Sequence, residues 1–265
     1  MKIQCDHVAL AGRNLRAAVL VAGLCVGALG QGAPSSALYE VVFDSVWSAE
    51  THPTDFPNGP HWSPLIGGTH TDAATFWEIG EIASAGIEAM AERGSITPLN
   101  QEVAAAIPLG TADQVLSGGG IAPSPGAVSL QFEMSSDFPL VTLVSMIAPS
   151  PDWFAGVSGL ALFEAGEWKD EVVVDLFMFD AGTDSGVSFT SLDADTQPRE
   201  PIAAITTFPF ENTPPVGTFM FVRLDGGEGE GEGEGEGEGE GEGEGEGEGE
   251  GEGEGEGEGE GEGEG

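Results

Sequence analysis

The last 40 residues of the chain set the strongest limit on what it can fold into. Residues 226–265 consist of glycine and glutamate alone, in near-strict alternation. Such a segment has no apolar side chain to bury, and its closely spaced negative charges repel one another, so it cannot build a packed core. We therefore predict a disordered, low-complexity tail that acts as a spacer, and any globular fold must be built from the residues before it.

The first 30 residues are predicted to be a secretory signal peptide. Lys2, Arg13 and Arg16 precede an uncharged, mostly apolar run at 17–30. This order is typical of a signal that is cleaved, here after Gly30. The run has 14 residues, whereas a membrane span needs about 20. We therefore expect a secreted or cell-surface protein with no stable membrane insertion after cleavage.

Both cysteines of the chain, Cys5 and Cys25, lie in the predicted leader. The domain predicted at 31–225 therefore contains no thiol, no disulfide and no thiolate metal site, and it must be stable through burial of apolar surface alone. A chain of this size buries roughly 70% of the surface that its unfolded form exposes, which is enough for one domain.

The predicted domain is strongly acidic. Residues 31–225 carry 26 acidic and 4 basic side chains, a formal charge of −22. Such a surface repels phosphate backbones and anionic lipids, which excludes nucleic-acid and membrane-surface binding, and it favours cations and basic partners. Solubility in salt is the alternative interpretation of the same charge.

Five segments of the predicted domain have the pattern of β-strands. Segment 39–47 is rich in β-branched and aromatic residues, and 128–134 and 218–224 alternate apolar with polar positions. Segments 140–147 and 172–179 are near-continuous apolar runs flanked by proline or glycine, a pattern typical of strands that are buried on both faces.

Two short helices are predicted between these strands. The first covers 84–93, with Ser84 as its N-cap and Gly94 as its stop, and the second covers 99–107. We interpret both as insertions, because the segments around them are rich in proline, glycine and small polar residues. The prediction is an all-β fold: an antiparallel β-sandwich with long loops and a few short helices in them.

The strongest candidate site combines two loops that each follow a predicted strand. Asp152 lies just after the strand at 140–147, and Asp180 and Asp184 lie just after the strand at 172–179. Glycines at 182 and 186 allow the backbone to turn tightly, so that three carboxylates can converge. Carboxylate oxygens suit Ca²⁺, which accepts six to eight oxygen ligands, better than Mg²⁺, which demands a strict octahedron. Ordinary turn caps are the alternative interpretation of these aspartates.

The sequence also resembles a known family. Asp180, in the phrase DAGTDSG, follows Asp152, in the phrase PSPDW, by 28 residues. This two-part pattern is similar to the spondin N-terminal domain, and the similarity covers roughly residues 38–224. The phrases that carry it are WSAETHPTDFP, HWSPLIGGTH, FWEIGEIASAGIEAMAERGS, APSPDWFAGVSGL and DLFMFDAGTDSGVSF.

The resemblance implies a β-sandwich similar to C2 domains that binds one Ca²⁺ ion. It also implies that the three aspartates of the two phrases, Asp152, Asp180 and Asp184, are the metal ligands. Animal spondins add cysteines and matrix-binding repeats, whereas residues 31–225 contain no cysteine. In this respect the chain is similar to bacterial members of the family, and matrix or receptor binding does not transfer to it.

Two other patterns suggest chemistry that we do not predict. His52, His61 and His70 are nine residues apart, whereas structural zinc sites pair ligands two to five residues apart. We interpret these histidines as residues that pack loops and form hydrogen bonds. Asp184 also begins the Asp-Ser-Gly triplet of aspartic proteases, but that chemistry needs two such carboxylates, and the sequence has only one copy.

The function predicted from the sequence is that of a secreted, non-catalytic, calcium-binding module that mediates adhesion or surface interaction. Its partners would be the calcium ion and an unidentified surface or matrix component. Two alternatives stay open. One is an extracellular hydrolase that uses the same aspartates around a catalytic metal. The other is a passive spacer without a specific ligand.

Overall fold

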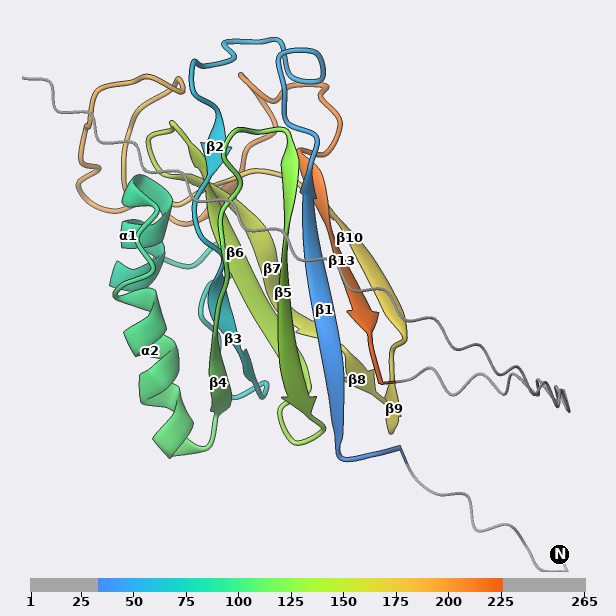
Figure 1. Ribbon diagram of the computed structural model, residues 1–265. Helices are drawn as coiled ribbons and strands as arrows, with labels where there is room; N and C mark the ends of the chain where they lie inside the picture. The colour runs from blue at the N-terminus through green and yellow to red at the C-terminus, as the bar shows by residue number, and fades with distance from the viewer. Residues whose placement is uncertain (1–32, 226–265) are drawn as a thin grey trace, which may run out of the picture. The chain divides into compact units, whose positions relative to one another are not determined.

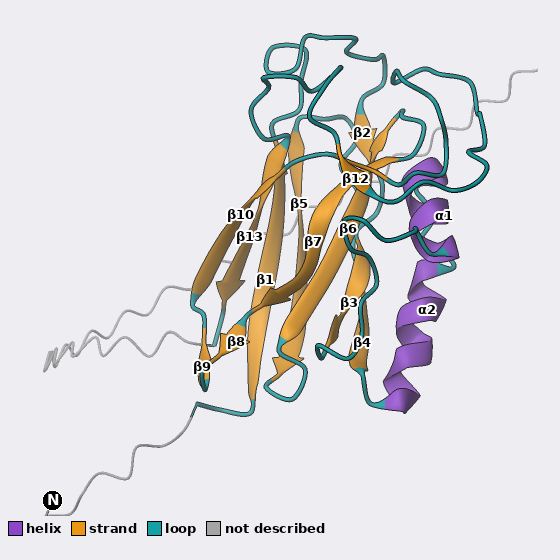
Figure 2. Cartoon of the chain, turned by 180° about the vertical axis from the view of Figure 1, so that it is seen from behind, coloured by secondary structure: helices purple, strands orange, loops and turns teal. Residues whose placement is uncertain are grey.

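The computed structural model describes residues 33–225. They form two antiparallel sheets that face each other (Figures 1 and 2). The predicted signal peptide at 1–30 and the predicted tail at 226–265 lie outside the described residues. Among residues 33–225, no helix combines the length and the apolar character that crossing a membrane requires.

The first sheet has the strand order β10-β13-β1-β5, and all its pairings are antiparallel. Its strands are β10 (Glu171–Leu176), β13 (Gly217–Arg223), β1 (Ser36–Ser45) and β5 (Gly126–Ser135). The central strand β1 follows the expected alternation, because Tyr39, Val41 and Phe43 point into the interior and are buried, while Leu38 is exposed. The strand predictions at 39–47, 128–134 and 218–224 are thereby confirmed with small shifts of their ends.

The second sheet has the order β12-β11-β7-β6-β3-β4, with β2 paired to β6 beside it. Its strands are β12 (Ala203–Ala204), β11 (Phe179–Asp180), β7 (Trp153–Ala161), β6 (Leu140–Ala148), β3 (Ile66–His70), β4 (Ala112–Ser117) and β2 (His61–Trp62). A small hairpin of β8 (Phe163–Glu164) and β9 (Glu167–Trp168) lies apart. Strand β6 is buried on both faces, as its apolar run predicts.

The prediction for 172–179 is wrong in two respects. This segment is split between β10 in the first sheet and β11 in the second. Strand β10 is an edge strand with an exposed outer face, on which Val173 is 54% exposed. An edge strand tolerates apolar residues on the face that is exposed to solvent. The continuous run of valines therefore did not indicate that the strand is buried on both faces.

The two predicted helices are confirmed. Helix α1 (Ala85–Arg93) begins at the N-cap Ser84, whose Oγ accepts a hydrogen bond from the Ile87 amide at 3.2 Å. It ends at Gly94, which adopts a left-handed conformation with φ of 61°. Helix α2 (Leu99–Ala106) continues into a short 3₁₀ turn, η1 (Ile107–Leu109).

The two helices are part of the packed domain and are not only insertions in a loop. They lie in the connection between β3 and β4 and cover the outer face of the second sheet (Figure 1). Their apolar residues form a second core with that sheet, separate from the core between the sheets. Ile87 and Met90 of α1 are fully buried there, as are Ile66 of β3 and Val144 of β6.

Strands β3 and β7 were not predicted, because each contains two glycines and glycine is a poor strand former. The glycines permit close packing. A Cβ atom on Gly67 would lie 1.9 Å from the Thr142 carbonyl oxygen, and one on Gly156 would lie 2.2 Å from the Leu143 carbonyl oxygen.

The core between the sheets is built around packed aromatic rings. Phe43 of β1 packs edge-on against Trp62, with ring centroids 4.9 Å apart, and against Phe219 of β13 at 5.1 Å. All five tryptophans of the chain are among the buried residues. Such pairs add to the free energy that burial of their area supplies.

We expect Phe219→Ala to lower the free energy of unfolding by about 3–5 kcal/mol, because it leaves a cavity among fully buried rings. Urea unfolding measures this loss. Val173→Ala on β10 of the same sheet is the control, and it should change stability by less than about 0.5 kcal/mol because the side chain is largely exposed. Equal losses in the two variants would contradict this assignment of the core.

Candidate metal centre

The pairing of β7 with β11 places the two predicted site loops side by side. Asp152 immediately precedes β7, and Asp180 is the last residue of β11, where it pairs with Trp153. The Ala181 amide donates to the Asp152 carbonyl oxygen at 3.1 Å and extends this pairing past the strand end. The sequence prediction that both loops follow strands and lie next to each other is therefore confirmed.

Asp152 is fully buried, and its two carboxylate oxygens have different surroundings. Oδ2 accepts hydrogen bonds from the Thr183 amide at 2.7 Å, the Asp184 amide at 3.0 Å and the Thr183 hydroxyl at 3.2 Å. Oδ1 is equally buried but has no hydrogen-bond partner within residues 33–225. A buried carboxylate oxygen without a partner is costly, so this atom is the feature of the site that needs an explanation.

The charge state of Asp152 reflects this burial. Its pKa is raised from the ordinary value of 3.8 to about 6, mainly because burial disfavours the charged form and next because the Asp180 carboxylate lies nearby. The hydrogen bonds from Thr183 and Asp184 act in the opposite direction. The neighbouring Asp180 carboxylate thus disfavours the charged form of Asp152.

Asp180 is partly buried beside it. Its Oδ1 accepts a hydrogen bond from the Gly182 amide at 2.8 Å, which closes a tight turn. Burial raises the pKa of Asp180, and the charges of Glu200 and Asp184 raise it further. Gly182 has φ of 73°, and a Cβ atom there would lie 2.0 Å from the Glu200 carbonyl oxygen, so this turn requires glycine.

Asp184 is also buried, but its carboxylate is used within its own loop. Oδ1 accepts from the Gly186 amide and Oδ2 from the Ala194 amide, both at 2.7 Å. The structure thus brings Asp152 and Asp180 together and places Asp184 next to them. Within residues 33–225 it shows no group of three or more His, Cys, Asp or Glu side chains spaced to hold a metal ion.

Two residues that the sequence analysis overlooked hold this loop in place. Thr183 supplies two of the three hydrogen bonds to Asp152, as described above. Arg199 donates to the Thr183 carbonyl oxygen at 2.6 Å and forms ion pairs with Glu88 of α1 at 2.7 Å and with Asp195 at 2.9 Å. Arg199 is one of only four basic residues in 31–225. A rare basic residue in an acidic loop is the sequence feature that could have indicated this structural role.

Aromatic residues form the floor under the site. Trp153 is buried and packs edge-on against Phe189 and Phe210, with ring centroids 5.1 and 5.8 Å apart. This packing fixes the start of β7 and with it the adjacent Asp152.

The three histidines have the structural roles that their spacing predicts. His52 and His70 are buried, and each contacts polar atoms through both ring nitrogens, His52 with Thr51 and the Pro214 carbonyl oxygen. His70 does so with the Thr71 carbonyl oxygen and Thr142. His61 contacts the Gly59 carbonyl oxygen.

Comparison with known proteins decides the family. The family model described as Spondin_N matches residues 37–216, which include all three aspartates. The chain belongs to the spondin family. The resemblance noted in the sequence is thereby confirmed.

Individual spondins are similar over the same region. The chain is 35% identical to rat spondin-2 over 204 residues, which are 71% of this chain and 62% of that protein. It is 32% identical to human spondin-2 over 226 residues, 78% of this chain and 68% of that protein. Against rat spondin-1 it is 36% identical over 191 residues, 68% of this chain but 23% of that spondin.

The raised pKa of Asp152 predicts how stability depends on pH in EDTA. The folded-state value of about 6 lies above the value of about 3.9 expected for an unfolded aspartate, so the folded spondin domain binds this proton more tightly. The stabilisation is complete below about pH 4 and is lost as pH rises through 6, by about 3 kcal/mol in total.

Urea unfolding of the wild type and Asp152→Asn between pH 4 and pH 8 measures this effect. The wild type should lose stability relative to the variant as pH rises, because asparagine carries no proton to lose. Asp175→Asn, which removes an exposed carboxylate of β10, is the control for the loss of one acidic group. A stability difference between the wild type and Asp152→Asn that is constant across this range would contradict the assignment.

Proposed function

We propose that this chain is a non-catalytic, calcium-binding spondin module of an exported protein and that it acts in adhesion or surface interaction. The observation that carries the proposal is Asp152 Oδ1, a fully buried carboxylate oxygen that has no partner among residues 33–225 and lies next to a second carboxylate, that of Asp180. A divalent cation between them would supply the missing partner and remove the repulsion between the two charges.

The residues present fit a hard cation. Asp152 would bind it through Oδ1, and Asp180 through the oxygen that does not accept from Gly182. Each oxygen of Asp184 accepts one amide and keeps a second lone pair, so Asp184 would bind the ion while it keeps both hydrogen bonds. The ion would supply positive charge that ties the two loops together. Ca²⁺ is favoured over Mg²⁺ because it tolerates irregular oxygen shells.

The local chemistry supports a binding role rather than catalysis. A metal-dependent hydrolase needs a general base that can reach a metal-bound water. His52 and His70 are buried and use their ring nitrogens in hydrogen bonds elsewhere, as described above. Asp152 Oδ2 and both oxygens of Asp184 are already occupied by backbone amides that organise the loop. These carboxylate oxygens therefore stabilise the conformation of the loop.

The surface role rests on three features. The pattern at 1–30 predicts export. The chain matches spondins over most of the domain. The domain presents an acidic surface on which each of the four basic side chains forms an ion pair with an acidic neighbour. Such a surface attracts cations and basic partners.

We expect millimolar Ca²⁺ to raise the melting temperature of the chain relative to EDTA. A ligand present at 100 times its dissociation constant adds about 2.7 kcal/mol, which corresponds to roughly 5–10 °C for a domain of this size. Differential scanning fluorimetry with Ca²⁺, Mg²⁺ and EDTA measures the shift.

Asp180→Asn should abolish most of this shift, because it removes a charge from the cation site. The matched control is Asp175→Asn, which changes the same functional group on an exposed face of the other sheet and should leave the calcium shift intact. Identical melting of the wild type in Ca²⁺ and EDTA would refute the proposed calcium site.

A further inference from the structure

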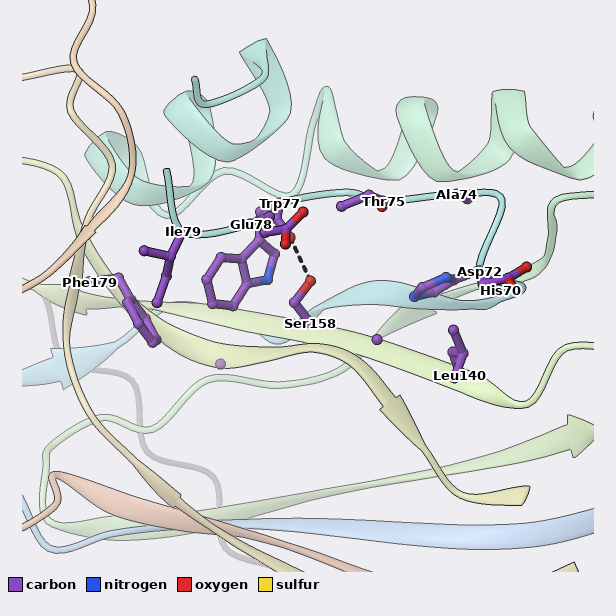
Figure 3. Close-up of a pocket in the computed structure, with 12 residues that line it drawn as sticks. His70, Asp72, Ala74, Thr75, Trp77, Glu78, Ile79, Leu140, Ser158 and Phe179 are labelled. Atoms are coloured by element: carbon purple, nitrogen blue, oxygen red, sulfur yellow. Dashed lines mark hydrogen bonds between the residues drawn. The ribbon is translucent and has the colours of Figure 1, made fainter. Parts of the chain in front are cut away.

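A groove lies on the second sheet and is lined by residues of β7, by Leu140 of β6, by His70 of β3 and by the segment 72–79. It encloses about 610 Å³ between β7 and the segment 72–79. Figure 3 shows its lining residues spread from Phe179 and Ile79 at one end, past Trp77 and Ser158, to Asp72 and Leu140 at the other. Its elongated form suits a chain segment more than a compact ligand.

One of the strands that line the groove, β7, has an edge that is partly open. Strand β11 pairs with β7 only at Trp153 and Phe154, so β7 has no strand partner on this side from 155 to 161 among the described residues. Trp77 covers part of this edge, because its indole nitrogen donates to the Val157 carbonyl oxygen at 3.3 Å. An open edge next to a groove is the arrangement that an extended peptide uses when it docks along a strand.

The charged groups in the groove have one sign. Asp72 and Glu78 are both exposed, and neither forms an ion pair within residues 33–225. The other ionisable lining residue is His70, whose pKa is lowered by burial, so it adds no positive charge at neutral pH. The apolar part of the lining comes from Trp77, Ile79 and the aromatic and aliphatic residues around them.

We propose that this groove binds an extended, basic segment of a partner protein, with lysine or arginine side chains directed at Asp72 and Glu78 and apolar side chains placed over Trp77 and Ile79. Charge selects this occupant. A second copy of the domain carries −22, and the segment 226–265 of this chain contains only glycine and glutamate, so both are repelled. In an extended segment, alternate side chains point to opposite sides, which separates the basic from the apolar contacts.

The inference rests on the surface-interaction role proposed above and does not depend on the calcium site. None of the three aspartates at that site lines the groove. Binding measured in both EDTA and Ca²⁺ therefore separates the two ideas. Loss of the calcium-induced stabilisation with peptide binding intact would refute only the cation site, and the reverse result would refute only the groove.

The test measures fluorescence anisotropy of a labelled peptide of about eight residues, alternating lysine with valine, titrated with the full chain. The length corresponds to an extended strand of about 26 Å. We expect saturable binding of this peptide and none of a matched peptide that alternates glutamate with valine. Asp72→Asn combined with Glu78→Gln should weaken binding about tenfold, since two exposed ion pairs are lost.

Two matched controls locate the site. Glu171→Gln combined with Asp175→Asn removes the same charges from the exposed face of β10 on the other sheet and should change affinity less than twofold. Ile79→Ser should weaken binding, whereas Val173→Ser should not, although the two residues are similarly exposed at 56% and 54%. Equal loss in both charge variants, equal binding of the glutamate peptide, or no binding of the lysine peptide would overturn the proposal.

Discussion

The contact between the two sheets is the interaction on which the rest of the structure depends. Both cysteines, Cys5 and Cys25, precede residue 31, so residues 31–225 have no disulfide to hold the layers together. The layers are held by aromatic packing, with Phe43 of β1 between Trp62 and Phe219. The second core under the helices stiffens the other face of β3 and β6. With both faces of the second sheet packed, the loops at its strand ends have a rigid base.

That rigid base allows the aspartate loops to keep a costly arrangement. Asp152 is buried, one of its oxygens has no hydrogen-bond partner in the described part of the chain, and its neighbour Asp180 adds repulsion between like charges. The fold offsets part of this cost through the amides of Thr183 and Asp184, the ion pairs of Arg199 and the packing of Trp153 on Phe189. The cation that we propose for this site would give Asp152 Oδ1 a partner and reduce the repulsion between the two carboxylates.

The second main property of the domain is its uncompensated negative charge. Each of its four basic side chains is engaged in an ion pair, and most of its 26 acidic groups form no ion pair with another described residue. The uncompensated charge is spread over the surface, but the groove between β7 and the segment 72–79 combines two acidic side chains with an apolar lining, and β7 has a partly open edge. Negative charge attracts basic segments to the whole surface, whereas the shape and the apolar lining of the groove distinguish it from the rest of that surface.

The sequence by itself determined the strands with strong patterns, both helices with the caps Ser84 and Gly94, the family, and the two loops that carry Asp152 and Asp180. These features depend on local propensity, alternation or a motif, which neighbouring residues encode. Only the tertiary structure decided the rest. The glycine-containing strands β3 and β7 exist because of close contacts with β6, and the run at 172–179 is split because its ends pair with different sheets. The surroundings of Asp152, one of whose oxygens has no partner within 33–225, and the groove lined by Trp77 also arise from residues far apart in the chain, and no local pattern reports which distant atoms meet.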